Sequence, residues 1–573
     1  MLVDDENQGV HMTQAERLLA NLGASESGNR FVVQKVYCDA YERQNSTYPQ
    51  ARTEIFDYLA DGTSVFAFIG HGSPTALGSK KIIEPNDFRD RFHLRRLPFF
   101  YTATCNFLKW DYDLTSMAEQ LMFQSDGGII GCFAALRPVF ITQNGNLSAR
   151  FGTTLGSLAD DGRELTFGEL YRLTKNGVNN DQNKMRYVLM ADPALRLSAP
   201  GQFVRVETIN GVDATNPDAQ IELKARQTLT ITGSVLGPDG KPMDDFNGHL
   251  TASLYDAERS VTSYGHGDGE KVTFEKMGDK LLTASGTITN GRFSFTCRMP
   301  SSFSDNYRPA TFSFYASAAD DADGRHAMGV LRNVYAYGYD ENAEADDWAP
   351  TIHSLTLNSD GFKDGDKVNE SPMVIARISD DCGINVSTSG VGRQMVIIID
   401  DKQTYADCSR HFTLDHTPEE GMAMSGTLSY PLADLAPGAH QLKLRVWDLA
   451  ENVTERTIDF KVVNGLKPEI FSVYTDAMPA RSEANFYINH NRPDALMNIR
   501  LTVYTLNGKA VWSHEIQTRS NMNTTDPIRW NLTDKAGRRV ERGIYLYRAE
   551  ISTDGETFTT KSRKIAVAAD GTE

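Results

Sequence analysis

The fold is decided by one stretch, Ser64-Val65-Phe66-Ala67-Phe68-Ile69-Gly70-His71-Gly72-Ser73. Its first half is apolar and lacks the polar alternation of a half-exposed strand, which is typical of a strand buried on both faces of a parallel sheet. Similar apolar strands at 97–102 and 128–134 alternate with helical patterns at 50–59 and 114–124. This order predicts an α/β domain whose parallel sheet is covered by helices on both faces.

The first residues predict the opening strand and helix of this domain. Leu2 and Val3 form a short apolar strand that runs directly into acidic residues. A helix is expected from the capping box Thr13-x-x-Glu16 to Gly23, and a strand is expected at 31–37. Since no basic and apolar leader precedes the opening strand, we expect this sequence to begin inside the domain.

The sequence pattern changes after about residue 198. Short alternating strands replace helices, and turns such as Asn290-Gly291 and Asn507-Gly508 separate them. This pattern predicts tandem β-sandwiches of immunoglobulin-like type. Interruptions near 347–350 and 464–468 divide the chain into an α/β domain followed by three all-β domains, which are expected at 1–198, 199–347, 348–466 and 467–573.

Composition excludes several classes of protein. The 573 residues are 40% hydrophobic and 23% charged, which rules out a mainly disordered chain. No run of about 18 apolar residues occurs. The formal net charge of −17 argues against binding to nucleic acids or anionic membranes, because phosphate surfaces would repel the chain.

A histidine and a cysteine each follow a predicted buried strand. His71 stands between two glycines, and Cys105 follows the strand at 97–102. Reactive groups in such sheets gather at the carboxyl ends of the strands. An imidazole that takes the proton of a thiol makes it a nucleophile, and Gly72 allows a backbone N–H to approach a substrate oxyanion. The alternative is a buried structural cysteine with a core histidine.

These two segments carry a family resemblance. Gly70-His71-Gly72-Ser73 and Ala103-Thr104-Cys105-Asn106 resemble the histidine and cysteine motifs of the gingipain-type cysteine peptidases, the C25 family, whose fold is caspase-like. Gly127-Gly128-Ile129-Ile130-Gly131 and Asp192-Pro193-Ala194-Leu195 match this family as well. The resemblance covers residue 1 to about 198 and implies a cysteine peptidase.

The resemblance also implies roles for individual residues. His71 and Cys105 would form the catalytic dyad, and the amides of Gly72 and Cys105 would form the oxyanion hole. An acidic residue from an earlier strand end orients the histidine in this family, and Asp5 is the candidate, with the adjacent Asp4 left open.

Two further residues correspond to the specificity pocket of this family. Trp110 and Arg137 are expected to bind substrate there. For Trp110, the alternative is simple packing on the helix that follows it.

A narrower resemblance comes from both ends of the chain. Asp4-Asp5-Glu6-Asn7 with His11, and the segment 134–139, look most like the branch of the family that acts as the sortase of the type IX secretion system. The stretches 501–509, 530–532 and 543–547 resemble the C-terminal sandwich that addresses cargo to this system.

This narrower resemblance implies a place and a set of partners. The place is the extracellular face of the outer membrane. The partners are secreted cargo proteins with C-terminal signal domains, which the enzyme removes, an anionic lipopolysaccharide as acceptor, and outer-membrane subunits of the secretion system. The alternatives are a secreted gingipain-like endopeptidase and a non-catalytic surface adhesin.

The remaining cysteines, histidines and acidic clusters give weaker signals. Core packing is expected for Cys38, Cys132 and Cys297, whereas Cys382 and Cys408 allow a disulfide. Solvated acidic turns are favoured over calcium sites at 4–6 and 320–323. His411 and His416 lack the other ligands of a zinc site, and Gly265-His266-Gly267 has no nearby partner cysteine. The sequence therefore predicts neither a metal site nor a cofactor.

Overall fold

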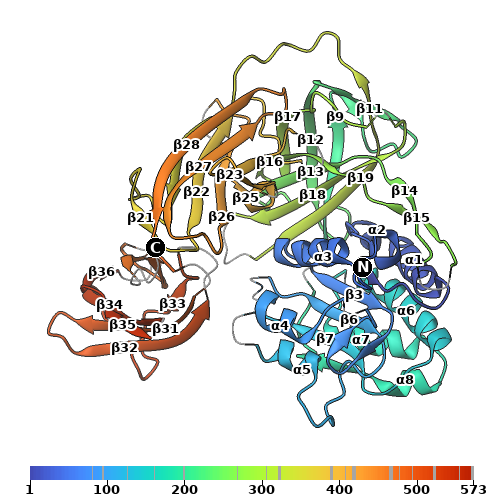
Figure 1. Ribbon diagram of the computed structural model, residues 1–573, viewed down its shortest axis with the longest axis horizontal. Coiled ribbons are helices and arrows are strands. Elements are labelled where there is room, and N and C mark those ends of the chain that lie inside the picture. Colours follow the sequence, from blue (N-terminus) through green and yellow to red (C-terminus); the bar gives the residue numbers. More distant parts are fainter. Residues whose placement is uncertain are drawn as a thin grey trace.

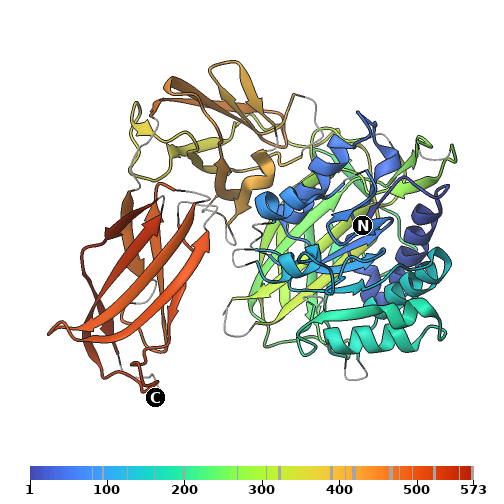
Figure 2. The same cartoon turned by 60° about the horizontal axis from the view of Figure 1, so that its bottom comes forward.

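The structure is a computed structural model, and it describes residues 1–573 except 81, 93, 95, 125–126, 160–161, 198–200, 267–268, 305, 320–323, 388–391, 407, 416–417, 419–420, 464–468, 476–477, 493–494, 520–523, 554 and 569–573. An α/β domain is followed by all-β domains, as predicted (Figure 1). The second domain (green to yellow) lies against the α/β domain (blue to cyan) in both ribbon views (Figures 1 and 2).

The α/β domain contains a six-stranded sheet with the order β2-β1-β3-β6-β7-β8. All neighbours pair in parallel except β8, which is antiparallel to β7. The predicted parallel sheet is thus confirmed, with an antiparallel strand at one edge. The strands are β1 (Leu2–Val3), β2 (Val36–Tyr37), β3 (Val65–Ile69), β6 (Phe99–Ala103), β7 (Gly131–Ala135) and β8 (Tyr187–Ala191).

Helices cover both faces of this sheet. On one face, α1 (Val10–Gly23), α6 (Ile141–Leu155) and α7 (Phe167–Asn176) pack on the side chains of Ala67 and Ile69. On the other, α3 (Pro49–Asp61), α4 (Pro85–Arg91) and α5 (Met117–Met122) lie against the face that carries Phe66 and Phe68. Burial on both faces explains why β3 is apolar throughout. Two short helices complete the domain, α2 (Glu26–Asn29) and α8 (Gln182–Arg186).

Helix α1 begins earlier than its predicted capping box. Its N-cap is Gly9, which has a φ of 71° in the left-handed region, and Thr13 lies inside the helix. Glu16 does not cap the helix, because its carboxylate accepts hydrogen bonds from Lys35 Nζ at 2.9 Å and from the Tyr37 hydroxyl at 2.5 Å. The expected strand at 31–37 is reduced to Val36–Tyr37. Tertiary contacts therefore override the local capping signal.

Helices α1 and α6 approach closely at two glycines. A Cβ atom at Gly152 would lie 2.2 Å from the backbone carbonyl oxygen of Leu18. A Cβ atom at Gly145 would lie 2.8 Å from Nε2 of Gln14. This contact fixes α1, and the loop at the start of α1 borders the ends of β1 and β3.

The second domain differs from the predicted two-sheet sandwich. Its nine-stranded sheet has the order β10-β9-β12-β17-β16-β13-β18-β19-β11, and an additional parallel pairing joins β19 to β9. The sheet therefore closes on itself around one core, with Leu229, Leu250 and Phe312 among its fully buried residues. The strands are β9 (Gln202–Ile209), β10 (Val212–Asp213), β11 (Ile221–Ala225), β12 (Thr228–Leu236), β13 (Gly248–Tyr255), β16 (Lys280–Thr289), β17 (Arg292–Arg298), β18 (Ala310–Ala318) and β19 (His326–Tyr339).

The third domain is a sandwich of two sheets, as predicted. One sheet has the order β20-β22-β26-β25 and the other β21-β28-β27-β23-β24. The boundary predicted near 347–350 falls in the strand-free segment before β20, whereas the one near 464–468 lies outside the described residues. The strands are β20 (Thr351–Leu357), β21 (Lys367–Val368), β22 (Met373–Asp380), β23 (Val396–Ile399), β24 (Gln403–Tyr405), β25 (Phe412–Leu414), β26 (Met424–Pro431), β27 (Gly438–Trp447) and β28 (Val453–Val462).

The C-terminal domain is also a two-sheet sandwich. A sheet β29-β30-β33 faces a sheet β32-β31-β34-β35, with β36 paired to β34. Trp530, the first residue of the stretch 530–532 in the C-terminal resemblance, is fully buried in its core. The strands are β29 (Ile470–Thr475), β30 (Ala484–His490), β31 (Leu496–Thr505), β32 (Ala510–Arg519), β33 (Ile528–Trp530), β34 (Gly543–Thr553), β35 (Glu556–Thr559) and β36 (Arg563–Val567).

The six cysteines are all free thiols, so the disulfide that the sequence allows between Cys382 and Cys408 is not formed. Cys382 packs in the core of the second domain, whereas Cys408 packs in the core of the third. Their common location in the third domain sequence therefore does not bring them together. Cys38, Cys132 and Cys297 are buried, as predicted.

A hairpin of the second domain holds the α/β domain. Its strands, β14 (Arg259–Thr262) and β15 (Thr273–Lys276), flank a turn whose Gly265 and His266 amides donate to the Asp39 carboxylate at 2.8 and 2.7 Å. Lys276 forms an ion pair with Glu54 at 2.8 Å. His266 therefore has a structural partner in the α/β domain rather than a cysteine.

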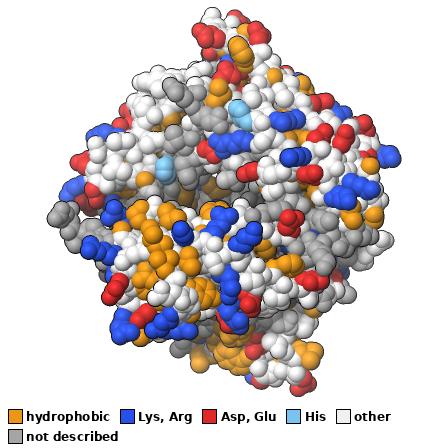
Figure 3. Space-filling model, turned by 90° about the vertical axis from the view of Figure 1, so that its left-hand side faces the viewer, with side chains coloured by type: hydrophobic (Ala, Val, Ile, Leu, Met, Phe, Trp, Pro, Cys, Tyr) orange, Lys and Arg blue, Asp and Glu red, His pale blue; other side chains and the backbone are white. Residues whose placement is uncertain are grey.

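The surface mixes both charge signs. Figure 3 shows hydrophobic side chains gathered in the lower half of one face, among Lys and Arg side chains. Exposed hydrophobic residues of the C-terminal domain include Leu506 and Ile544. None of the described helices combines the length and apolar character that a membrane-spanning helix requires.

The close approach of α1 and α6 makes a stability prediction. Gly152→Ala is expected to lower the free energy of unfolding of the α/β domain by roughly 1–3 kcal/mol, because the added Cβ would collide with backbone that cannot move aside. The matched control is Gly23→Ala in α1, where nothing lies within 4 Å of the added Cβ. There alanine improves helix propensity by up to about 1 kcal/mol. Thermal unfolding followed by circular dichroism compares the two variants, and equal stability would contradict the prediction.

Candidate active site

Three predicted site residues lie at one edge of the sheet. Strands β3 and β6 are parallel neighbours in which Ile69 pairs with Ala103, the last residue of each strand. His71 and Cys105 each stand two residues beyond that pair. Strand β7 continues the same register, and Arg137 stands two residues beyond its end. All three residues therefore stand two positions beyond the carboxyl ends of neighbouring parallel strands.

The turns that carry His71 and Cys105 touch each other. A Cβ atom at Gly72 would lie 2.5 Å from the hydroxyl oxygen of Thr104, the residue before Cys105. Gly72 opens the short strand β4 (Gly72–Ser73), which pairs with β5 (Ala76–Leu77). Glycine at this position therefore serves close packing, which is compatible with the predicted approach of its backbone to a substrate.

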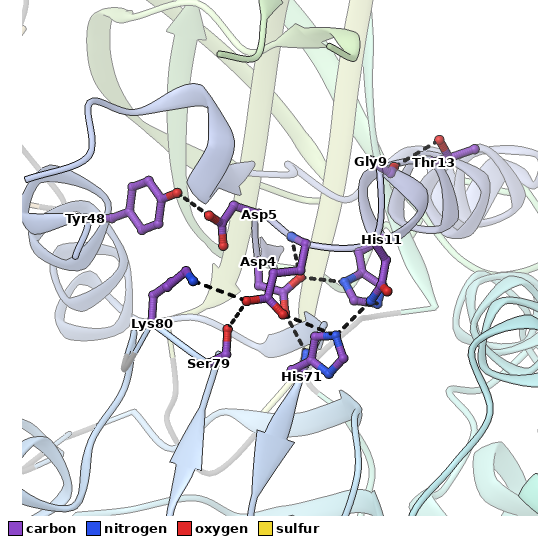
Figure 4. A network of polar contacts seen from close by, with 11 residues as sticks. Asp4, Asp5, Gly9, His11, Thr13, Tyr48, His71, Ser79 and Lys80 are labelled. Atoms are coloured by element: carbon purple, nitrogen blue, oxygen red, sulfur yellow. Dashed lines mark hydrogen bonds and ion pairs between the residues drawn. The ribbon is translucent and has the colours of Figure 1, made fainter. Parts of the chain in front are cut away.

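The His71 side chain is half-exposed and is held through one ring nitrogen. Nε2 lies 2.8 Å from the Asn7 amide nitrogen and 3.3 Å from Glu6 Oε2. Figure 4 shows the His71 ring beside His11 and Asp4. The Asn7 amide nitrogen also lies 3.2 Å from Nε2 of His11, so it bridges the two rings, whereas the Glu6 carboxylate favours a proton on Nε2 of His71. Within the described residues no hydrogen bond engages Nδ1. Nδ1 is therefore open to another partner, and it carries a lone pair for a thiol proton in the tautomer whose Nε2 proton faces Glu6.

Glu6 is itself fixed in place. Its carboxylate accepts a hydrogen bond from the Ser79 hydroxyl and lies 3.5 Å from the Lys80 ammonium. Both partners follow β5, so the segment after His71 folds back over the end of β1. The two contacts orient the carboxylate toward the imidazole.

Asp4 supports the same turn through the main chain. This buried carboxylate accepts a hydrogen bond from the His71 backbone N–H at 2.6 Å, and its other oxygen lies 2.5 Å from Nδ1 of His11. A Cβ atom at Gly70 would lie 2.6 Å from this carboxylate. Gly70 therefore makes room for the charge that holds the turn.

Asp5, the residue expected to orient the histidine, is placed elsewhere. Its carboxylate accepts a hydrogen bond from the Tyr48 hydroxyl at 2.5 Å and lies 3.9 Å from Arg43. Burial and the hydrogen bond with Asp5 raise the pKa of Tyr48 far above its ordinary value. In this structure the carboxylate at the imidazole belongs to Glu6, and Asp4 contacts only the backbone of His71.

The sequence reasoning missed the roles of Glu6, Asn7 and His11, although all three lie in the segment that carries the acidic residues. The alternation of side-chain direction along the segment after the opening strand could have identified Glu6. Asp4 and Glu6 stand two positions apart and share a side, while Asp5 faces the other way.

Cys105 is partly buried at the start of a sharp turn. Its Sγ accepts a hydrogen bond from the Val139 backbone N–H at 3.3 Å, and Asn106 has a φ of 59° in the left-handed region. Sγ also lies 3.8 Å from the Val139 carbonyl oxygen, to which the thiol can donate. No hydrogen bond joins Sγ to the His71 imidazole in the described part of the chain, so proton transfer requires the imidazole to turn or the two groups to approach. Such bonds are often long in the absence of substrate.

Trp110 and Arg137 lie on the surface beyond the ends of β6 and β7. Trp110 is 53% exposed, so simple packing on the following helix does not account for it. The Arg137 guanidinium pairs with both oxygens of Asp111, at 2.9 and 2.8 Å. The hydrogen bonds from Arg137 lower the pKa of Asp111. Arg137 is therefore held beside the Cys105 loop.

One group near the site offers atoms of metal-ligating type. Asp4, Glu6 and His71 present ligand atoms within 4.8 Å of one another. Each of these groups already has a hydrogen-bond or ion-pair partner in the protein. The other weak metal signals gain no support, because His411 packs its ring on Tyr430, and His416 and residues 320–323 lie outside the described residues.

Comparisons with known proteins bear on this arrangement. Residues 1–198 match peptidase family C25. The crystal structure of dimeric latent PorU from Porphyromonas gingivalis is similar, with 28% sequence identity, coverage of 72% of this chain and 38% of that chain, and a TM-score of 0.33. The crystal structure of the Arg-specific cysteine proteinase gingipain R (RgpB) is similar at 17% identity, with coverage of 58% and 66% and a TM-score of 0.29.

The family match carries the assignment. The present chain spans 38% of the length of that PorU chain, and both TM-scores are too low to support an argument from overall shape. A comparison with curated proteins gave no match. The matched residues include both motifs that carried the resemblance, His71 with its glycines and Cys105. Residues 1–198 of this chain are therefore a domain of peptidase family C25.

Proposed function

We propose that this chain is a cysteine peptidase in which Cys105 is the nucleophile and His71 its base. The observation that carries the proposal is the equivalent placement of the two residues, two positions beyond a paired strand end in a domain of a cysteine-peptidase family. Two contacts support it: Nδ1 of His71 is open to accept the thiol proton, and the Val139 N–H holds Sγ in place.

The reaction follows from these groups. His71 takes the proton of Cys105, Sγ attacks the scissile carbonyl carbon, and a C–S bond forms. The C–N bond then breaks as His71 returns the proton to the leaving amine, which leaves a thioester. Attack by water or by an amine on this thioester releases Sγ, which regains its proton. The backbone N–H groups of Gly72 and Cys105 are the proposed donors to the oxyanion.

We further propose that the enzyme acts as a sortase, which transfers the acyl group of the thioester to an amine. The proposed substrates are secreted cargo proteins with C-terminal signal domains, and the proposed acceptor is an amine of an anionic lipopolysaccharide at the extracellular face of the outer membrane. Outer-membrane secretion-system subunits are further proposed partners. Trp110 and Arg137 are proposed to bind the substrate beside Cys105. The motif resemblances near Asp4 and in the C-terminal sandwich support this role.

The dyad is tested by covalent labelling. A peptide with an electrophilic warhead is expected to add one label at Cys105, and His71→Ala is expected to slow labelling by about 100-fold or more, because the thiol loses its base. Mass spectrometry of the intact chain and of its peptides measures the label. Cys105→Ala is the blank, and Cys297→Ala, a change at a buried cysteine of another domain, is the matched control. Labelling that ignores His71 would argue for a non-catalytic surface protein.

The acid at the imidazole is tested by two isosteric changes. Glu6→Gln is expected to lower kcat/KM by about tenfold or more, because the ring loses the charge that holds its Nε2 proton. Asp5→Asn removes a charge of the same kind from the partner of Tyr48. Kinetics with a cleaved peptide compare the two variants after circular dichroism has verified their folding. A larger loss in Asp5→Asn would restore the sequence-based assignment and overturn the placement of Glu6.

The sortase role is tested by the fate of the thioester. Incubation with a cargo protein and an amino sugar acceptor is expected to yield cargo that has lost its signal domain and gained the mass of the acceptor. Cys105→Ala is expected to yield neither product. Cleaved cargo without acceptor at saturating amine would favour the endopeptidase instead.

A further inference from the structure

A second histidine stands beside the proposed catalytic one. His11 lies in the first turn of α1 and is only 5% exposed, whereas the His71 side chain is half-exposed. The two rings meet edge to face, with their centroids 5.4 Å apart (Figure 4). No atom of His11 takes part in the proposed reaction. A buried imidazole in contact with a catalytic side chain is the kind of group that holds this side chain in a productive geometry.

One side of the His11 ring is fixed by Asp4. Nδ1 of His11 lies 2.5 Å from Oδ1 of this buried carboxylate, whose other oxygen accepts the backbone N–H of His71. Because an ionised carboxylate can only accept hydrogen bonds, Nδ1 of His11 carries the proton of this contact. The opposite nitrogen, Nε2, then carries either a lone pair or a second proton.

The other side of the His11 ring faces the Asn7 side chain. The amide nitrogen of Asn7 lies 3.2 Å from Nε2 of His11 and 2.8 Å from Nε2 of His71, so one amide group bridges both rings. A side-chain amide can turn over, which exchanges its nitrogen and oxygen at nearly the same positions. The state of the two rings therefore decides which amide atom faces them.

The two directions of the amide have opposite consequences for His71. With the amide nitrogen toward the rings, both Nε2 atoms accept, and the proton of His71 sits on Nδ1, where it blocks uptake of a thiol proton. With the amide oxygen toward the rings, both Nε2 atoms donate to it, and Nδ1 of His71 keeps a lone pair for the thiol. The Glu6 carboxylate, 3.3 Å from Nε2 of His71, favours the second direction because it attracts the same proton.

We propose that His11 is a positioning residue of the dyad, whose Nε2 proton turns the Asn7 amide oxygen toward His71. This inference rests on the proposed function, because it assigns the tautomer in which His71 serves as the base of the thiol. In this arrangement His11 carries a proton on each nitrogen, and the Asp4 carboxylate at Nδ1 balances its charge. His11 therefore acts on the dyad through the amide and takes up no proton from the thiol itself.

The backbone also holds the amide between the rings. Asn7 and Gln8 have φ angles of 58° and 54°, and Gly9 follows at 71°, so three consecutive residues adopt the left-handed conformation. Residues other than glycine keep this conformation where the surrounding structure fixes it. One such contact comes from the second domain, because a Cβ atom at Gly9 would lie 2.5 Å from Cγ2 of Val272. The direction of the Asn7 amide is thus left to its hydrogen-bond partners, while its position is fixed.

Two substitutions separate the contacts of His11. His11→Asn places an amide near the position of Nδ1, so it can still bond Asp4 but has no atom in place of Nε2. His11→Gln reaches the position of Nε2 and can still donate to Asn7. Labelling of Cys105 in the full chain by an electrophilic peptide is expected to slow by about tenfold or more in His11→Asn and to recover severalfold in His11→Gln. Mass spectrometry measures the rates after circular dichroism has verified folding. Slower labelling in His11→Gln than in His11→Asn would overturn the proposal.

A sharper test fixes the direction of the bridging group. The carboxylate in Asn7→Asp can only accept, so it leaves no direction for His11 to set, and aspartate tolerates the left-handed conformation. In this background His11→Asn is expected to slow labelling by less than about threefold, against about tenfold or more without it. Gln8→Asp is the matched control, because it adds the same charge at the next residue, which is exposed and also left-handed. There the full cost of His11→Asn should return.

The outcomes distinguish this inference from the proposed function. An equal cost of His11→Asn in the wild type and in Asn7→Asp would show that His11 only supports Asp4 or the fold, and would overturn the inference alone. A labelling rate that neither His11 variant changes would do the same. Labelling of the wild type that does not depend on His71 would overturn the proposed function, and this inference with it.

Discussion

The site depends on the parallel pairing of three neighbouring strands in register. Since β3, β6 and β7 share hydrogen bonds along their length, their carboxyl ends finish level. His71, Cys105 and Arg137 then stand at the same position beyond each strand. A slip of one residue would turn each side chain to the opposite face of the sheet. The buried apolar faces of the strands prevent such a slip. The strand register that packs the core therefore also places the dyad.

A single buried carboxylate joins this frame to the catalytic turn. Asp4 follows β1, which pairs with β3, and it receives the His71 backbone N–H and approaches His11. The absence of a side chain at Gly70 is what admits it. The same segment then carries Glu6 and Asn7 to the imidazole. The end of the opening strand therefore positions the histidine twice, through its backbone and through its ring.

Much of this could be predicted from local patterns. The apolar runs located β3, β6 and β7 to within three residues, and the glycine flanks with the cysteine motif located the dyad. The prediction of a capping box at Thr13 was wrong, because the Glu16 carboxylate accepts hydrogen bonds from Lys35 and Tyr37 instead of capping the helix. The prediction of a sandwich for the second domain was wrong, because alternating strands do not show whether a sheet closes on itself.

The sequence by itself determined which segments are buried strands, where they end, and which reactive side chains stand at those ends. It did so because apolar periodicity and glycine turns are local properties of the chain. Only the tertiary structure decided which of three consecutive acids meets the imidazole, since Asp4, Asp5 and Glu6 share their chemistry and differ in direction. It also decided that Cys382 and Cys408 lie in separate cores. Which of these residues come into contact depends on how distant segments of the chain pack together, and a local sequence pattern does not contain that information.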